Sequence, residues 1–96
     1  MTIGVVATLT IAEGKNEEFE TVFSELVAKV NQNEEGCNFY QLHKSRTDGQ
    51  VYVVLEEYVD QAALEHHGGT DYFRELGKKM GGCLAAAPSV EYFDGV

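Results

Sequence analysis

The chain is poor in the residues that mark several large classes of protein. Among its 96 residues there are only two cysteines, Cys37 and Cys83, which lie far apart, so no disulfide is predicted and reduced thiols are favoured. The longest apolar runs, such as VYVVL and CLAAA, are far shorter than the roughly 20 residues that cross a bilayer. The first residues lack a basic segment and a long apolar block, so we expect a cytoplasmic protein.

Basic side chains are also scarce. Seven Lys and Arg residues stand against sixteen Asp and Glu residues, which gives a formal net charge of −9. Because this charge repels phosphate backbones and anionic lipids, we expect neither nucleic acid nor a membrane as a partner. The length and a hydrophobic content of 44% predict a single domain over residues 1–96 with one shared core.

Alternating apolar residues predict a first strand over residues 3–11. Asn16 is expected to cap a helix whose apolar residues recur at helical spacing from Phe19 to Val30. Residues 38–44 and 51–59 are predicted to form a hairpin, since Asp-Gly lies between them. The first half of the chain therefore reads as strand, helix, strand, strand.

The second half predicts a divided helical region. Asp60 is expected to cap a short helix through Leu64, and Thr70 or Asp71 to start a second helix that bends or ends near Gly81. After a proline, residues 89–94 read as a last strand. The order βαββαβ predicts an α+β, ferredoxin-like fold, in which helices cover one face of an antiparallel sheet.

The third predicted strand has two largely apolar faces. One carries Val51, Val53 and Leu55, and the other carries Tyr52, Val54, Glu56 and Tyr58. Helices on one side of the sheet would leave the first face in water, so we expect a second copy of the chain to cover it, sheet against sheet. The predicted assembly is a homodimer.

Several segments together resemble the antibiotic biosynthesis monooxygenase family. They are VVAxLxI at 5–11, EGK at 13–15, EEGCNFYQLHKS at 34–45, ExYxD at 56–60, AALxxH at 62–67 and TxxF at 70–73. The resemblance implies ferredoxin-like subunits whose sheets pair into a dimeric α+β barrel. Some family oxygenases oxidise phenolic or quinol-type substrates without metal or flavin, which implies no cofactor here. The superfamily also holds haem-degrading enzymes, isomerases and members of no known activity.

The haem-degrading branch is disfavoured. Those relatives bind iron through a histidine four residues after the Phe of the TxxF segment, and they use a Trp to distort the porphyrin. In this chain that position is Gly77, and there is no Trp.

His67 is the candidate catalytic base, because it occupies the family's histidine position and imidazole titrates near neutral pH. It is placed at a bend loosened by Gly68 and Gly69. The alternative is a histidine that only pins this loop by hydrogen bonds. His66 is expected to face solvent, and no metal site is predicted from the adjacent pair.

Five further residues are assigned to substrate binding: Asn38, Tyr40, Glu56, Tyr58 and Phe73. Strand alternation directs Tyr40 and Asn38 into the same pocket as Tyr58, between sheet and helices. The alternative for Tyr58, which we favour, is a core aromatic whose hydroxyl is satisfied at the edge. A carboxylate on an apolar face must be paired, hydrogen-bonded or shifted in pKa, so Glu56 is either a second acid/base or, as we favour, a buried anchor. The packing of Phe73 is expected to shape the pocket.

Three functions stay open. The first is a cofactor-independent monooxygenase acting on a small phenolic or quinol-like aromatic. The second is an isomerase or lyase that moves protons on a small carbonyl compound in the same pocket. The third is a dimeric binding protein without catalysis.

Overall fold

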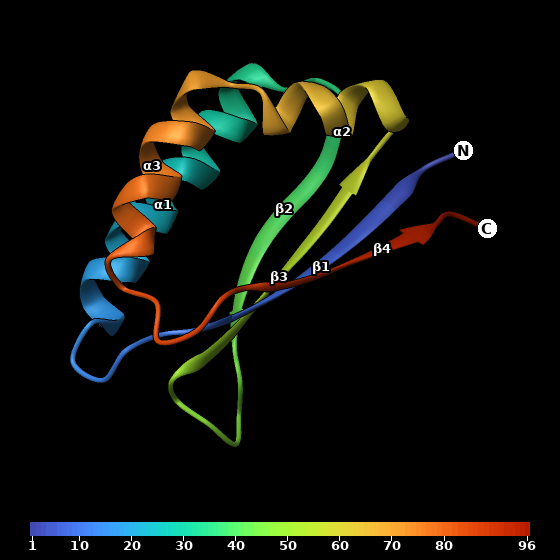
Figure 1. Cartoon of the computed structure of the whole chain (residues 1–96). Coiled ribbons are helices and arrows are strands. Elements are labelled where there is room, and N and C mark those ends of the chain that lie inside the picture. Colours follow the sequence, from blue (N-terminus) through green and yellow to red (C-terminus); the bar gives the residue numbers. More distant parts are fainter.

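The computed structural model describes residues 1–96 and shows a single sheet with all helices on one side (Figure 1). The elements follow in the order β1 (Ile3–Thr10), α1 (Asn16–Asn33), β2 (Cys37–Lys44), β3 (Val51–Tyr58), α2 (Gln61–Gly68), α3 (Asp71–Gly81) and β4 (Ser89–Asp94). The sheet is antiparallel with strand order β2-β3-β1-β4, which confirms the predicted α+β, ferredoxin-like arrangement. Within one chain the sheet is open, with β2 and β4 at its edges. None of the helices combines the length and hydropathy needed to cross a bilayer.

Helix α1 supplies the helical side of the core. Its buried residues lie at the predicted helical spacing: Phe19, Phe23, Leu26 and Val30. Each such side chain stabilises the fold by about 1.5–3 kcal/mol when it leaves water. The Phe19 ring packs 4.9 Å from that of Tyr52 on β3, and the Phe23 ring stacks 5.5 Å from that of Tyr40 on β2. These contacts fix α1 across the β2-β3 half of the sheet.

Asn16 does not cap α1, so this prediction was wrong. Lys15 occupies the N-cap position and makes no capping hydrogen bond through its side chain. The Asn16 amide instead donates to the carbonyl of Gly49 at 2.8 Å and to the Tyr52 hydroxyl at 3.0 Å. Its donors are thus used to hold the β2-β3 hairpin against the start of the helix.

The two faces of β3 are as predicted. All four residues that point towards the helices are buried: Tyr52, Val54, Glu56 and Tyr58. The strand register sets Glu56 beside Tyr40 on β2 and Val5 on β1, and Val5 in turn beside Tyr92 on β4. This row of four side chains crosses the whole sheet on the helical side and places one carboxylate at its centre.

The divided helical region is confirmed, but its first helix is longer than predicted. Asp60 accepts a hydrogen bond from the Ala63 amide at 2.9 Å, and Thr70 caps α3 through the Phe73 amide at 3.3 Å. Helix α2 continues past Leu64 to Gly68, so His67 lies in its last turn rather than at a loosened bend. The glycines that follow keep negative φ angles and do not use their conformational freedom.

Candidate functional site

A cavity of about 830 Å³ lies between the helical side of the sheet and helices α2 and α3. Fifteen of its 23 lining residues are hydrophobic, so a ligand there would exchange water for an apolar wall. The β4 side of this wall is the least covered, since Val90 is 44% exposed and Tyr92 is 62% exposed. The cavity is therefore accessible along β4.

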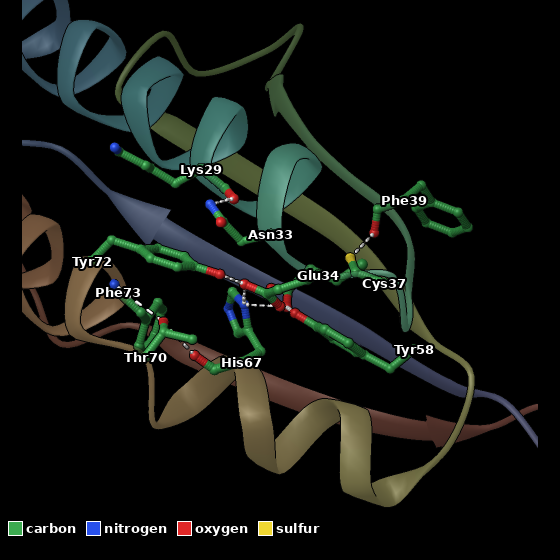
Figure 2. A network of polar contacts seen from close by, with 11 residues as sticks. Lys29, Asn33, Glu34, Cys37, Phe39, Tyr58, His67, Thr70, Tyr72 and Phe73 are labelled. Atoms are coloured by element: carbon green, nitrogen blue, oxygen red, sulfur yellow. Dashed lines mark hydrogen bonds and ion pairs between the residues drawn. The ribbon is translucent and has the colours of Figure 1, made fainter.

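His67 projects from α2 into a network of buried polar contacts (Figure 2). Its Nδ1 lies 2.9 Å from Oε1 and 3.1 Å from Oε2 of Glu34, which follows the last residue of α1. The hydroxyl of Tyr72, on α3, donates to Oε2 of the same carboxylate. Because an ionised carboxylate only accepts, this geometry places the imidazole proton on Nδ1 and leaves the lone pair on Nε2.

The Nε2 atom of His67 makes no hydrogen bond within the chain. Since every fully buried side-chain nitrogen and oxygen has a partner, Nε2 is not fully buried. His67 lines the cavity, and we infer that Nε2 is open to it. Tyr40 also lines the cavity, and its hydroxyl has no hydrogen-bond partner in the chain. By the same argument, this hydroxyl is open to the cavity. Burial raises the pKa of Tyr40, so this hydroxyl stays protonated and can donate.

Aromatic rings fix the orientation of the His67 imidazole. Its ring centroid lies 4.7 Å from that of Phe73, 5.1 Å from Tyr40 and 5.4 Å from Tyr58. Burial among these rings lowers the pKa of His67 below its ordinary value, and the neighbouring Glu34 partly offsets this effect. The imidazole is therefore neutral near pH 7, which is the form that can accept a proton.

Glu56 is a second titratable group on the cavity wall. It is 8% exposed, and its Oε1 accepts a hydrogen bond from the Tyr58 hydroxyl at 2.7 Å. Burial, and to a smaller extent the charge of Glu34, raises the pKa of Glu56 to about 7, against the hydrogen bond from Tyr58. A carboxyl with this pKa can give or take a proton at neutral pH.

The sequence profile of the family described as antibiotic biosynthesis monooxygenase matches residues 2–79. This chain belongs to the antibiotic biosynthesis monooxygenase family. A candidate antibiotic biosynthesis monooxygenase from Caulobacter crescentus CB15 is 55% identical, and its crystal structure gives a TM-score of 0.97 over 99% of this chain and 90% of that chain. The structure of another antibiotic biosynthesis monooxygenase is 28% identical, with a TM-score of 0.89 and 98% of each chain covered.

A curated relative, an uncharacterized protein of Synechocystis sp., is 26% identical over 91 residues. The match covers 95% of this chain but only 61% of that protein. Together with the structural neighbours, membership of the antibiotic biosynthesis monooxygenase family supports a general monooxygenase-like role.

In this family member, most of the predicted site residues come together. His67, Tyr40, Glu56 and Phe73 all line the cavity. Tyr58 does not, because it is fully buried and its hydroxyl is used by Glu56. The assignment of Tyr58 to substrate binding was therefore wrong, whereas the favoured alternative, a core aromatic with a satisfied hydroxyl, is what the structure shows. Tyr58 holds the Glu56 carboxyl in place.

Asn38 was also placed wrongly. An irregularity in β2 sets Cys37 opposite Tyr58 and Phe39 opposite Glu57, so Asn38 is an extra residue without a partner of its own. Simple alternation fails at such a bulge. The Asn38 side chain is exposed and donates to Oε2 of Glu57 at 2.8 Å, outside the cavity.

Glu34 and Tyr72 are the site residues that sequence reasoning missed. Glu34 lies four residues after Val30 and so continues the buried stripe of α1. A carboxylate on a buried stripe is a signal that could have marked it. Tyr72 lies among the apolar residues of α3, and nothing in the sequence pattern distinguishes its hydroxyl.

The cavity has no cluster of side chains for a metal ion, and it lacks the side chain through which haem-degrading relatives bind iron. No group of three or more His, Cys, Asp or Glu side chains is arranged to hold a metal ion. At the position where haem-degrading relatives carry their iron ligand, Gly77 lines the cavity without a side chain. His66 is exposed, as predicted, and is not among the lining residues.

Proposed function

We propose that this chain is a monooxygenase that acts on a phenolic or quinol-like aromatic compound, with His67 as the general base. The observation that carries the proposal is the imidazole itself: its Nε2 faces an apolar cavity while its Nδ1 donates to the buried carboxylate of Glu34. This arrangement fixes the basic tautomer, and it stabilises the imidazolium that forms when Nε2 takes a proton.

The chemistry needs an electron-rich ring, which deprotonation provides. Nε2 of His67 takes the proton of a ring hydroxyl, and the resulting phenolate passes electrons to O2. For a hydroquinone, O2 gives one oxygen to a ring carbon and the other leaves as water, so hydroquinone and O2 yield hydroxyquinone and water. Four electrons leave the ring: two as the C–H carbon becomes C–OH, and two as both original hydroxyls become carbonyls.

Two other cavity groups complete the proposed site. The unpartnered Tyr40 hydroxyl is a donor for a substrate oxygen, and it lies on the row that also carries Glu56. Glu56, whose pKa is about 7, can take up or return the second proton of the hydroquinone. Phe73, whose ring is tilted against that of His67, provides an apolar surface for the substrate ring.

The test is oxygen uptake with an anaerobically prepared dihydroquinone and ¹⁸O2. We expect one ¹⁸O atom in the product and one in water, in excess of the reaction with heat-denatured protein. His67→Ala should abolish this excess, and His66→Ala, the matched exposed neighbour, should retain it. Unlabelled quinone with hydrogen peroxide would make the protein an oxidase, and full activity of His67→Ala would reject His67 as the base.

A proton-transfer isomerase or lyase is the second candidate. It is favoured by the presence of two titratable groups, His67 and Glu56, on the wall of one cavity. Turnover of a small carbonyl compound under strict anaerobiosis would support it. A ligand that raises the melting temperature while no product forms would instead indicate a binding protein.

We also propose a homodimer formed through the outer face of the sheet, which no helix covers (Figure 1). Val53 and Leu55 lie on this face, and Phe39 at its edge is 39% exposed. Burying such an apolar face between two copies removes it from water. Light scattering at micromolar concentration should give twice the chain mass, and Val53→Glu should give the monomer. A monomeric wild-type protein would refute the proposal.

A further inference from the structure

The charges around the cavity have one sign. None of its 23 lining residues is Lys or Arg, whereas Glu56 lies within it and Glu65 and Asp94 lie exposed on its rim. A fourth carboxylate, Glu34, stands directly behind His67. We infer that the cavity selects uncharged aromatic ligands and excludes those that carry a carboxylate, a phosphate or an already ionised hydroxyl. The inference rests on the proposed function only in taking this cavity as the substrate site.

An anionic ligand would find no compensating charge in the cavity. It would lose hydration against a mostly apolar wall, and that loss is costly unless a cation or several donors replace the water. The His67 imidazole is neutral and its Nδ1–H is already used by Glu34. The side-chain donors that remain on the wall are all neutral: the hydroxyls of Tyr40 and Tyr92 and the amide of Gln61. The carboxylates of Glu65 and Asp94, and the ionised fraction of Glu56, add repulsion to this loss.

This selectivity has a consequence for the order of steps. A phenolate formed in solution is repelled, so the substrate must enter with its hydroxyl protonated and lose the proton inside, to Nε2 of His67. The imidazolium formed by that transfer is then the cation that faces the new phenolate. Ionisation of the substrate and the appearance of its counter-charge therefore occur in one event, within the cavity.

The size of the cavity indicates suitable probes. A volume of about 830 Å³ falls within the range of about 300–1,000 Å³ typical of sites for drug-sized ligands. A two-ring phenol is thus a fair test compound. Methyl 6-hydroxy-2-naphthoate and 6-hydroxy-2-naphthoate are close in shape and differ by one negative charge at neutral pH.

The experiment is a fluorescence titration of the full chain with each compound, under nitrogen and near neutral pH, so that no turnover is needed. We expect the ester to bind at least about tenfold more tightly than the acid. The double variant Glu65→Gln/Asp94→Asn should bind the acid about threefold or more tightly than wild type and leave the ester unchanged. This gain should shrink as salt rises, because both rim carboxylates are exposed.

The matched control is Glu17→Gln/Glu25→Gln, which makes the same change in net charge on the exposed side of α1. It should leave the binding of both compounds as in wild type. Equal affinity of wild type for acid and ester, equal gains in the two double variants, or failure of the ester to bind would each overturn the inference.

These outcomes are separable from the failure of the proposed reaction. Discrimination between ester and acid without ¹⁸O incorporation would sustain the charge selectivity and reject the monooxygenase. Labelled product from a protein that binds both compounds equally would support the monooxygenase and reject the charge selectivity.

Discussion

Replacing Glu34 by Gln tests the link between this buried carboxylate and the base that it holds. The Gln side chain has nearly the same shape, its oxygen can accept from Nδ1 of His67, and its amide can donate to the Tyr72 hydroxyl. The fold should therefore persist. What is lost is the negative charge that stabilises the imidazolium when Nε2 takes the substrate proton.

The size of the effect follows from the kind of hydrogen bond that is weakened. A bond to a charged group contributes about 1.5–3 kcal/mol, and about 1.4 kcal/mol corresponds to a factor of ten. We therefore expect kcat to fall by about 10- to 150-fold. Truncation to Ala would be less informative, because it leaves two buried donors without a partner and destabilises the fold.

The pH profile distinguishes this role from a merely structural one. Glu34 raises the pKa of His67 against the lowering effect of burial, so its neutralisation must lower that pKa further. The acid limb of the kcat/KM profile, where His67 gains its proton, should move to lower pH in Glu34→Gln. Initial rates of oxygen uptake across pH, with circular dichroism to check folding, measure both effects.

Glu35→Gln is the control for this experiment. It removes the same charge one residue further along, where the side chain is exposed. It should leave kcat and the acid limb unchanged. If Glu34→Gln keeps kcat within twofold of wild type and an unmoved acid limb, the carboxylate does not act through His67.

Three further predictions concern Glu56, Gly36 and Asn38. The pKa of Glu56 is raised from 4.5 to about 7, so the folded state holds this proton more tightly, and stability should fall as pH rises from about 4.5 to about 7. The accumulated loss of unfolding free energy is about 3 kcal/mol. Chemical denaturation should therefore show a difference in unfolding free energy between Glu56→Gln and wild type that grows with pH across that window. A difference that stays constant with pH would contradict the raised pKa. A Cβ at Gly36 would lie 2.6 Å from the Cβ of Ala63, so Gly36→Ala should cost about 1–3 kcal/mol in unfolding free energy. Adding Ala63→Gly should recover part of that cost, and no recovery would place the strain elsewhere. Asn38→Ala should keep kcat/KM within about twofold, since its side chain bonds Glu57 outside the cavity; a larger loss would return Asn38 to the site.

The fold was predictable from sequence because its signals are local and repeat. The stripe from Phe19 to Val30 and the alternation in β3 each report one face of one element, and both appear in the structure as predicted. The capping roles of Asp60 and Thr70 are equally local, since each bonds an amide three residues ahead. Patterns of this kind need no knowledge of distant contacts.

The site was predictable only in part, because its decisive contacts join residues far apart in the chain. His67 could be proposed as a base, but its partner Glu34 lies 33 residues away. Asn38 was misplaced because one extra residue in β2 reverses the alternation on which the prediction depended. Tyr58 was assigned to the correct face, yet only the packed structure shows that Glu56 uses its hydroxyl.

Strand β4 provides a cavity wall and little else. Its six residues are all exposed, it pairs only with β1, and none of its side chains belongs to the hydrophobic core. This part of the cavity wall is thus separate from the core, unlike Phe19, Phe23 and Tyr40, which belong to both. Substitutions at Val90, Tyr92 or Asp94 can change the size, polarity or charge of the cavity at small cost to folding. This strand is accordingly the segment through which the same scaffold could be adapted to a different ligand, by design as well as by natural variation.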